Sequence, residues 1–372
     1  MKLVSIDKND SIHFCTEMKT YLSPEVVCLP ILDKMDKKKN IKKAEKAFGS
    51  FASVSGTLTG VLKCQLSSGK KVPCAVLKND FQEKTIGNAI RKKIVGLSKT
   101  EIIGSLFTAS LKEKMNVPSF KTLVVSGIDL EPLIANELFI QKEYLQCLLE
   151  AIDMLLKAYS GERAIIAISN RSSDIISVYH NFLGTYKNIS LKMVPDLYLI
   201  GEEIFLTKYL HVRESYLYLK TSELYTLYYQ VKKRRMPSEK LITISGDFNS
   251  EIQVFLVKIG TRVTELFQSF YPMPLDSYDI YVNGVMRGKT LPIDALIVTD
   301  DFSGLVIMKK KKQKVYECIK CGKCNAVCPI HSKPILAYKQ GKEIPCIQCG
   351  LCSYVCPAFI PLRRYLGGKK HE

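Results

Sequence analysis

Two cysteine runs near the C-terminus constrain this chain more than any other feature. Residues 318–329 read CIKCGKCNAVCP and residues 346–357 read CIQCGLCSYVCP, so eight of the 13 cysteines lie in two copies of one pattern. Thiolates are soft ligands, and four of them suit zinc or an iron–sulfur cluster. Zinc sites pair two Cys-x-x-Cys hooks across a longer loop, whereas these runs have the ferredoxin spacing. The pattern predicts iron–sulfur clusters over a structural zinc or a disulfide framework.

The fourth cysteine of such a run ligates the other cluster, because the three-residue gap and the following proline turn it away. We therefore predict two [4Fe-4S] clusters with crossed ligands. The first is assigned to Cys318, Cys321, Cys324 and Cys356. The second is assigned to Cys346, Cys349, Cys352 and Cys328. Gly322 and Gly350 lie inside the hooks, where backbone N–H groups must approach cluster sulfur without a Cβ atom in the way.

Clusters of this kind move single electrons, so the lobe is predicted to be a relay between protein partners. Thiolate-rich sites favour a reducing compartment. The first residues, MKLVSIDKNDSIHF, are charged and contain no apolar h-region of a signal peptide. No apolar run reaches the 18 or so residues of a membrane span. We expect a cytoplasmic protein, attached to the inner face of the cell membrane, if at all, through a partner.

The chain is strongly basic. Its formal net charge is +18, with lysine and arginine concentrated at 34–46, 232–235 and 309–314. Two oxidised clusters with their thiolates would reduce this charge to roughly +14. Such blocks are commonly a solvated surface, but they also suit docking of an acidic redox protein or of an anionic membrane. Nucleic acid is a third candidate partner, although the chain has no recognisable binding motif for it.

The 372 residues are enough for several domains, and a composition that is 47% hydrophobic supports real cores. We predict a multidomain α/β and α+β fold in four parts, each recognised by its pattern of strands and helices. The parts are a β-rich, barrel-sandwich-like domain at 1–82, a Rossmann-like α/β domain at 83–232, a β-grasp domain at 238–308 and a dicluster ferredoxin domain at 315–366.

Local signals place several elements. The runs 61–66 and 71–77 flank SSGK and predict a hairpin, in which Pro73 places the second strand at a sheet edge. A helix is expected over 83–96. Ser98 and Glu101 form a capping box that starts another, single helix with an apolar stripe. The stripe comprises Ile102, Ile103, Leu106, Phe107 and Leu111.

Further strands and helices complete the two middle domains. In the α/β domain, strands are predicted at 121–127, 163–169 and 191–195, with helices at 143–161 and 173–185. In the β-grasp domain, strands are predicted at 241–247, 251–260, 279–285 and 295–300, with a helix at 261–270.

The order of these parts resembles the C subunit of the Rnf electron-transport complex, a family related to the NADH-binding subunit of respiratory complex I. FASVSGTLTG (51–60) is similar to the family's HASVSG, and TLVVSGIDLEPLIANE (122–137) to its TLIINGVECEPYITAD. The stretch 241–267 resembles its soluble-ligand-binding β-grasp (SLBB) domain, and CIQCGLCSYVCPAFIPLRRYL its second cluster run. The resemblance implies that the α/β domain binds FMN and meets NADH, while clusters carry electrons onward.

The chain departs from the family at the loop that would hold flavin phosphate. The family has GIVGLGGAGFPT where this chain has KIVGLSKTEIIG (93–104): Gly96 is kept, but Ser98, Lys99 and Glu101 replace glycines. A glycine-rich loop works because bare N–H groups reach the phosphate at a helix N-terminus, and the Glu101 carboxylate would repel it.

The second pocket stretch is altered as well. Ser126 and Asp129 replace the family's Asn and Glu, although Glu131 and Pro132 match. YLIGEEIFL (198–206) retains part of the family's YPQGGEKQL. We expect a flavin site that is weakened or lost.

These observations predict an iron–sulfur electron-transfer subunit of an oxidoreductase complex, rather than a self-contained enzyme with catalytic residues of its own. Its partners would be a ferredoxin- or flavodoxin-like carrier and membrane electron-transport subunits. One alternative is a flavin-dependent NADH dehydrogenase subunit with intact FMN binding. Another is a basic nucleic-acid-binding protein with structural clusters. The other cysteines, at 15, 28, 64, 74 and 147, have no ligand spacing, and Cys147 is predicted to be buried in an apolar helix.

Overall fold

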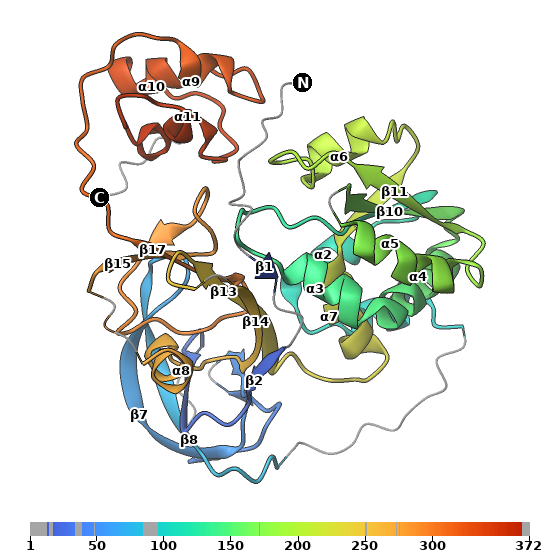
Figure 1. Ribbon diagram of the computed structural model, residues 1–372. Helices are drawn as coiled ribbons and strands as arrows, with labels where there is room; N and C mark the ends of the chain where they lie inside the picture. Colours follow the sequence, from blue (N-terminus) through green and yellow to red (C-terminus); the bar gives the residue numbers. More distant parts are fainter. Residues whose placement is uncertain are drawn as a thin grey trace.

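The computed structural model describes residues 13–14, 18–33, 39–47, 49–84, 96–170, 172–249, 251–272, 274 and 276–366. It is a mixed α/β protein with several sheets, as the sequence predicts. Figure 1 shows an α/β layer on one side, two further groups of strands beside it, and a small helical lobe at one end. The predicted helix at 83–96 lies almost entirely outside the described residues. The four domain boundaries stay predictions.

The first sheet has the order β3-β8-β7-β4. Its strands are β3 (Val26–Pro30), β4 (Asn40–Ile41), β7 (Gly56–Gln65) and β8 (Lys71–Asn79), beside a two-stranded pair of β5 (Lys46–Ala47) and β6 (Ser50–Phe51). The predicted hairpin is confirmed as β7 and β8, but the edge position of Pro73 is wrong, because β8 lies between β3 and β7. Pro73 lies at the end of the β3 pairing, where its carbonyl oxygen still accepts from the Ile31 N–H at 3.0 Å, so only the donor that proline lacks is lost.

The α/β layer is built on a parallel sheet with the order β11-β10-β9-β12. Its strands are β9 (Thr122–Ser126), β10 (Arg163–Ser169), β11 (Ile189–Val194) and β12 (Tyr216–Lys220). The helices that follow β9 in this part of the chain are α3 (Asn136–Glu143), α4 (Leu145–Tyr159), α5 (Ser173–Leu183), α6 (Glu203–Tyr209) and α7 (Thr221–Val231). Alternate side chains of one strand enter different cores, because a strand has period two. Leu123 and Val125 pack with α3, α4 and α7, while Val124 packs with Leu206 of α6.

The stripe after Ser98 does not form one helix. It is divided between α1 (Lys99–Ser105) and α2 (Ala109–Met115), because Leu106 is extended and ends α1. The backbone N–H of Phe107 donates to the Gln230 side chain at 2.7 Å instead of continuing the helix. A tertiary hydrogen bond to α7 therefore overrides the helical periodicity.

The third sheet has the order β1-β14-β13-β17-β15-β16, and β2 also pairs with β14. Its strands are β1 (His13–Phe14), β2 (Lys19–Tyr21), β13 (Glu239–Gly246), β14 (Glu251–Lys258), β15 (Tyr278–Val282), β16 (Lys289–Thr290) and β17 (Gly304–Lys309), with α8 (Val263–Phe270) packed on it. The strand predicted at 295–300 is wrong. Leu296 and Ile297 make only isolated bridges, to Gln65 and Arg262, and the central position belongs to β17.

The C-terminal lobe (residues 315–366) contains α9 (Lys323–Ala326), α10 (Pro334–Gln340), α11 (Leu351–Tyr354) and a 3₁₀ turn, η1 (Leu362–Tyr365). These elements are at the top of Figure 1, beyond the end of the third sheet. Across the part of the chain that the structure describes, no helix is both long and apolar enough to cross a bilayer.

Candidate functional site

The two cysteine runs fold as one repeated backbone conformation. Lys320 and Gln348 both have φ of 56°, and Gly322 and Gly350 have φ of 75° and 82°. These glycines are the N-caps of the one-turn helices α9 and α11. The backbone gives a second reason for glycine at positions 322 and 350, because both residues occupy the left-handed region that glycine adopts without strain.

Each predicted ligand set lines its own cavity in the lobe. One cavity is lined by Cys318, Cys321, Cys324 and Cys356 together with Ile319, Ala358 and neighbouring residues. The other is lined by Cys328, Cys346, Cys349 and Cys352, with Pro345 and Leu351 among the apolar neighbours. In both cavities the fourth thiol comes from the opposite run, so the structure brings the crossed sets together.

The eight thiols differ in burial. Cys321 is exposed, whereas Cys349 and Cys352 are 7% and 6% exposed. Burial raises the pKa of Cys324, Cys346 and Cys349, and raises that of Cys352 to about 12. With no bound cation these buried groups are neutral thiols, so loading either cavity with metal must displace protons.

The ligand atoms in each cavity are of the kind that binds an iron–sulfur cluster. Each cavity offers four sulfur atoms, which are the ligands such clusters use, inside largely apolar walls. The helices that begin at Gly322 and Gly350 have no side-chain cap hydrogen bond, so their first N–H groups remain available to cluster sulfur. Among the described residues, no group of three or more His, Cys, Asp or Glu side chains is placed to hold a single metal ion.

One residue that lines the second cavity, Cys349, contacts the α/β layer. The Tyr198 hydroxyl donates to the carbonyl oxygen of Cys349 at 2.7 Å, and Glu131 Oε1 lies 3.3 Å from the same hydroxyl. Tyr198, Met286 and Leu351 share one buried apolar cluster with Cys349. We call this contact the junction, defined by Glu131, Tyr198, Met286, Arg287 and Cys349. The backbone of a predicted cluster ligand is thereby hydrogen-bonded directly to the α/β layer.

Glu131 is central to the junction. Its Oε2 accepts from the backbone N–H groups of Met286 at 2.9 Å and Arg287 at 3.3 Å. Burial raises the pKa of Glu131, and the two N–H donors and the Arg287 cation partly oppose that rise. Arg287 also pairs with Glu202. The structure therefore uses Glu131 to join the α/β layer to the β15–β16 turn, and its role in flavin binding stays a prediction.

Arg363 completes the attachment of the lobe. Its guanidinium donates to the carbonyl oxygens of Met286 and, at 2.7 Å, of Gly288. Gly350 approaches the same turn so closely that a Cβ atom would overlap the Met286 carbonyl oxygen. The second run thus requires glycine at position 350 for both its φ and this contact.

The loop at 96–101 has the capping box that the sequence predicts. The Glu101 side chain accepts from the Ser98 backbone N–H at 2.9 Å, and the Glu101 backbone N–H points to Ser98 Oγ at 3.4 Å. Gly96 has φ of 82°. The Lys99 ammonium lies 5.6 Å from the centre of the Tyr159 ring. Two of the N–H groups that a phosphate would need are therefore engaged by the chain's own side chains.

The other altered pocket positions also have structural partners. Both carboxylate oxygens of Asp129 accept from backbone N–H groups in the first turn of α3, from Glu137 at 2.9 Å and Leu138 at 3.0 Å. Ser126 donates to the carbonyl oxygen of Gly201 at 3.1 Å. Asp129 thus caps a helix, a use that the sequence alone does not reveal.

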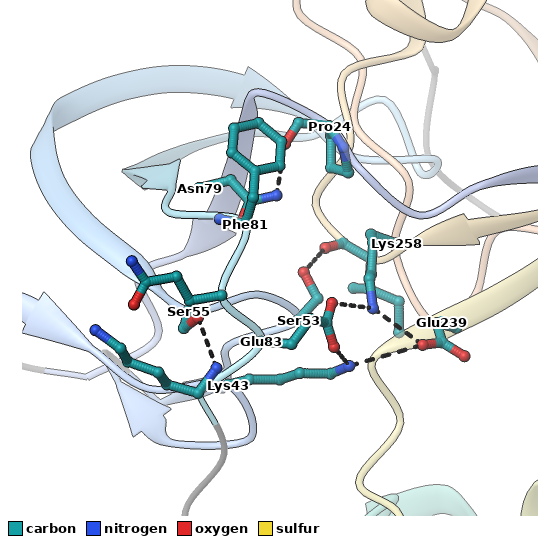
Figure 2. Close-up of polar contacts among 12 residues, drawn as sticks. Pro24, Lys43, Ser53, Ser55, Asn79, Phe81, Glu83, Glu239 and Lys258 are labelled. Carbon is teal, nitrogen blue, oxygen red and sulfur yellow. Dashed lines mark hydrogen bonds and ion pairs between the residues drawn. The ribbon is translucent and has the colours of Figure 1, made fainter.

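The FASVSG stretch holds the first sheet against the third. Ser53 donates to the carbonyl oxygen of Ile259 at 2.5 Å. Beside it the ammonium of Lys258, whose side chain is 1% exposed, lies 3.1 Å from Glu83 and 3.0 Å from Glu239 (Figure 2). Lys43 and Lys258 share Glu83 and Glu239 there, and the Ser53 hydrogen bond adds the FASVSG stretch to this structural joint.

Sequence spacing misses a group of three thiols. Cys28, Cys64 and Cys74 lie on β3, β7 and β8 and share one buried cluster with Ile297. They are distant in the sequence and meet only through strand pairing, which places Cys28 and Cys74 on neighbouring strands in diagonal register. Cys147, predicted to be buried, is only half-buried on α4, and the cysteine at position 15 lies outside the described residues.

Comparison with known proteins connects the chain to redox complexes. The family model described as the Nuo51 FMN-binding domain (Complex1_51K) matches residues 93–222. The C subunit of the ion-translocating oxidoreductase complex of Haemophilus influenzae is 25% identical over 271 residues, which cover 69% of this chain and 32% of that protein. The C subunit of the Na(+)-translocating ferredoxin:NAD(+) oxidoreductase complex of Acetobacterium woodii is 23% identical over 313 residues, which cover 76% of this chain and 70% of that protein.

These relatives confirm the resemblance to the Rnf family, and this chain matches only about a third of the length of the Haemophilus protein. Among solved structures, the NAD+-reducing [NiFe]-hydrogenase in the air-oxidised state is similar, with a TM-score of 0.45 and 13% identity, over 62% of this chain and 47% of that chain. Similarity at that level supports no conclusion about function.

Proposed function

We propose that this relative of the C subunits of ion-translocating oxidoreductase complexes is an electron-transfer subunit that relays single electrons through two [4Fe-4S] clusters. The observation that carries the proposal is the pair of cavities in the C-terminal lobe, each lined by one crossed set of four cysteines. The names of the relatives support the same class of function.

In this proposal the chain's own residues hold, insulate and orient the clusters. Cys318, Cys321, Cys324 and Cys356 hold the first, and Cys346, Cys349, Cys352 and Cys328 hold the second. Bound clusters would supply reversible one-electron chemistry. Leu351 and Ile360, at 0% and 2% exposed, exclude water from the lobe, and Tyr198 fixes the backbone of Cys349.

The partners follow from the same proposal. One partner is a soluble low-potential carrier, and the other is the membrane part of an oxidoreductase complex, on the cytoplasmic side. A relative named as part of a ferredoxin:NAD(+) oxidoreductase supports this arrangement.

The decisive experiment is an anaerobic inventory of iron, acid-labile sulfide and flavin per chain. We expect about eight iron and eight sulfide, as two cubanes require, and no stoichiometric FMN. Dithionite should bleach the cluster absorbance, while NADH alone should not. Two cubanes need about eight iron atoms. An iron content below about three atoms per chain, or zinc in place of iron, would disprove the relay.

A second candidate is a flavin-dependent NADH dehydrogenase subunit. The observation in its favour is the match of residues 93–222 to an FMN-binding family. Against it stands the capping box at Ser98 and Glu101, which engages N–H groups at the start of α1. The inventory separates the two candidates, because stoichiometric FMN and rapid bleaching by NADH are expected only from the second.

A further inference from the structure

The two thiol-lined cavities face different surroundings. One ligand of the second, Cys349, contacts the α/β layer at the junction, where Tyr198 is 7% exposed. In the first cavity, Cys321 is the one exposed thiol among the eight predicted ligands, all of which are described. A protein partner can therefore approach the first cavity at an exposed ligand, whereas one ligand of the second cavity is held against the α/β layer.

Apolar side chains surround the exposed end. Val315, Tyr316, Ile319 and Phe359 are 54%, 54%, 67% and 45% exposed. The Tyr316 N–H donates to the Ala358 carbonyl oxygen at 3.0 Å, which places the segments around 316 and 358 side by side. Ile319 itself lines the first cavity. Several large exposed apolar groups gathered at one place mark an interaction surface.

Exposed lysines neighbour these apolar side chains in the sequence. Residues 309–366 contain twelve lysines and arginines but only two glutamates, a net charge of +10 before any cluster is bound. Lys312, Lys314, Lys320 and Lys323 are exposed, and the Lys314 ammonium lies 5.8 Å from the centre of the Tyr316 ring. Two clusters with their thiolates would leave roughly +6, so the surface stays attractive to an acidic partner.

We propose that this surface docks a small acidic protein that carries single electrons, with Ile319 at its centre. We call it the carrier face, defined by Val315, Tyr316, Ile319 and Phe359 with the exposed lysines Lys312, Lys314, Lys320 and Lys323. The inference rests on the relay proposed above. One electron passes between the docked carrier and the cluster held at Cys321, and no bond is made or broken.

The combination of features favours a protein carrier over other anionic partners. Charge alone would also attract nucleic acid or an acidic membrane. An apolar centre that includes a wall of the redox cavity fits the desolvated core of a protein interface, and a carrier must approach its redox centre closely. Neither lipid nor nucleic acid would exchange an electron there.

The test measures binding of an oxidised, acidic plant-type [2Fe–2S] ferredoxin to the cluster-loaded protein by titration calorimetry. Lys312→Glu with Lys314→Glu, which lie outside the cysteine run, should weaken binding about tenfold at low ionic strength, and the difference should shrink at physiological salt, where the Debye length is about 8 Å. Lys187→Glu with Lys192→Glu makes the same change in net charge on exposed lysines of the α/β layer. This control should change affinity less than about twofold.

Ile319→Ser tests the apolar centre and should weaken binding at both salt concentrations. Equal effects of the two lysine pairs would overturn the carrier face, as would tight retention on phosphatidylserine vesicles without ferredoxin binding. Iron content of every variant is measured in parallel. A wild-type protein that lacks clusters refutes the relay, whereas loaded variants that bind ferredoxin as tightly as the wild type refute only the carrier face.

Discussion

The start of α1 and the starts of α9 and α11 differ in how they use their backbone N–H groups. Ser98 begins α1 in an extended conformation, with φ of −74° and ψ of 159°, and shares a capping box with Glu101. Gly322 and Gly350 begin α9 and α11 in the left-handed region, with no side-chain cap. In the family that the chain resembles, both places serve a bound group.

The difference shows how two side chains can occupy the backbone N–H groups at the start of a helix. The first N–H groups of any helix lack intrahelical acceptors. At α1 a serine and a glutamate satisfy two of them, which stabilises the helix and opposes an anion. At α9 and α11 the glycines leave them available beside the thiols. Substitutions in both regions test this contrast.

Loss of single cysteines should reveal the crossing of the two runs. Cys318→Ala should abolish the first cluster and Cys328→Ala the second, although both residues belong to the run at 318–328, because they line different cavities. Electron paramagnetic resonance of the dithionite-reduced variants distinguishes the remaining clusters. Cys147→Ala, on α4, serves as the control and should retain both. Loss of the same signal in both variants would contradict the assignment.

Gly322 and Gly350 should differ in how strongly an added side chain destabilises the protein. Alanine at either position meets the left-handed penalty of roughly 1–2 kcal/mol. At Gly350 the added Cβ also overlaps the Met286 carbonyl oxygen, whereas at Gly322 no described atom lies within 4 Å of it. Gly350→Ala should therefore lower the free energy of unfolding by about 1–3 kcal/mol more than Gly322→Ala, as overpacking does.

Anaerobic denaturant titration followed by tyrosine fluorescence measures that difference, and iron release during the titration reports the lobe itself. Equal losses for the two alanine variants would show that the lobe is not seated on the β15–β16 turn.

Removing the cap of α1 should cost stability without creating a flavin site. Ser98→Ala should lower the free energy of unfolding by about 1 kcal/mol, the usual value of an N-cap. Ser105→Ala, in the last turn of the same helix, is the matched control and should have a smaller effect. FMN fluorescence quenching should show no binding by either variant. Strong binding by Ser98→Ala would mean that the cap alone closes an otherwise intact pocket.

Some parts of the site can be predicted from short sequence patterns, and others cannot. The capping box at Ser98 and the two cysteine hooks depend on neighbours three or four residues apart, so the sequence predicted them. The Cys28, Cys64 and Cys74 cluster depends on the register of three strands, and the split between α1 and α2 depends on Gln230. Contacts between residues distant in the chain carry no short-range signal. The strand at 304–309 is a different case, because its apolar run GLVIM is itself a short-range strand signal.

Glu131 has one role by resemblance and another by contact: the resemblance assigns it to the flavin pocket, while its contacts hold the turn that supports the lobe. Burial raises its pKa above the ordinary value of 4.5. A raised carboxyl pKa means that the folded state holds its proton more tightly than the unfolded state does. The contribution of Glu131 to stability is therefore fully present below pH 4.5 and declines as the pH rises through the folded-state pKa.

Glu131→Gln removes this titration while keeping an oxygen that can accept from the Met286 N–H. The stability of the native protein relative to this variant should fall as the pH rises from about 4 toward neutrality. The fall should be smaller than the effects above, because the N–H donors and Arg287, itself paired with Glu202, partly compensate the charge. Burial raises the pKa of Tyr198, which faces the same carboxylate, well above this range, so its hydroxyl does not titrate there. Denaturation midpoints of both proteins across that range measure the effect. A difference that grows in the opposite direction would show that the junction binds the ionised carboxylate more strongly than burial disfavours it.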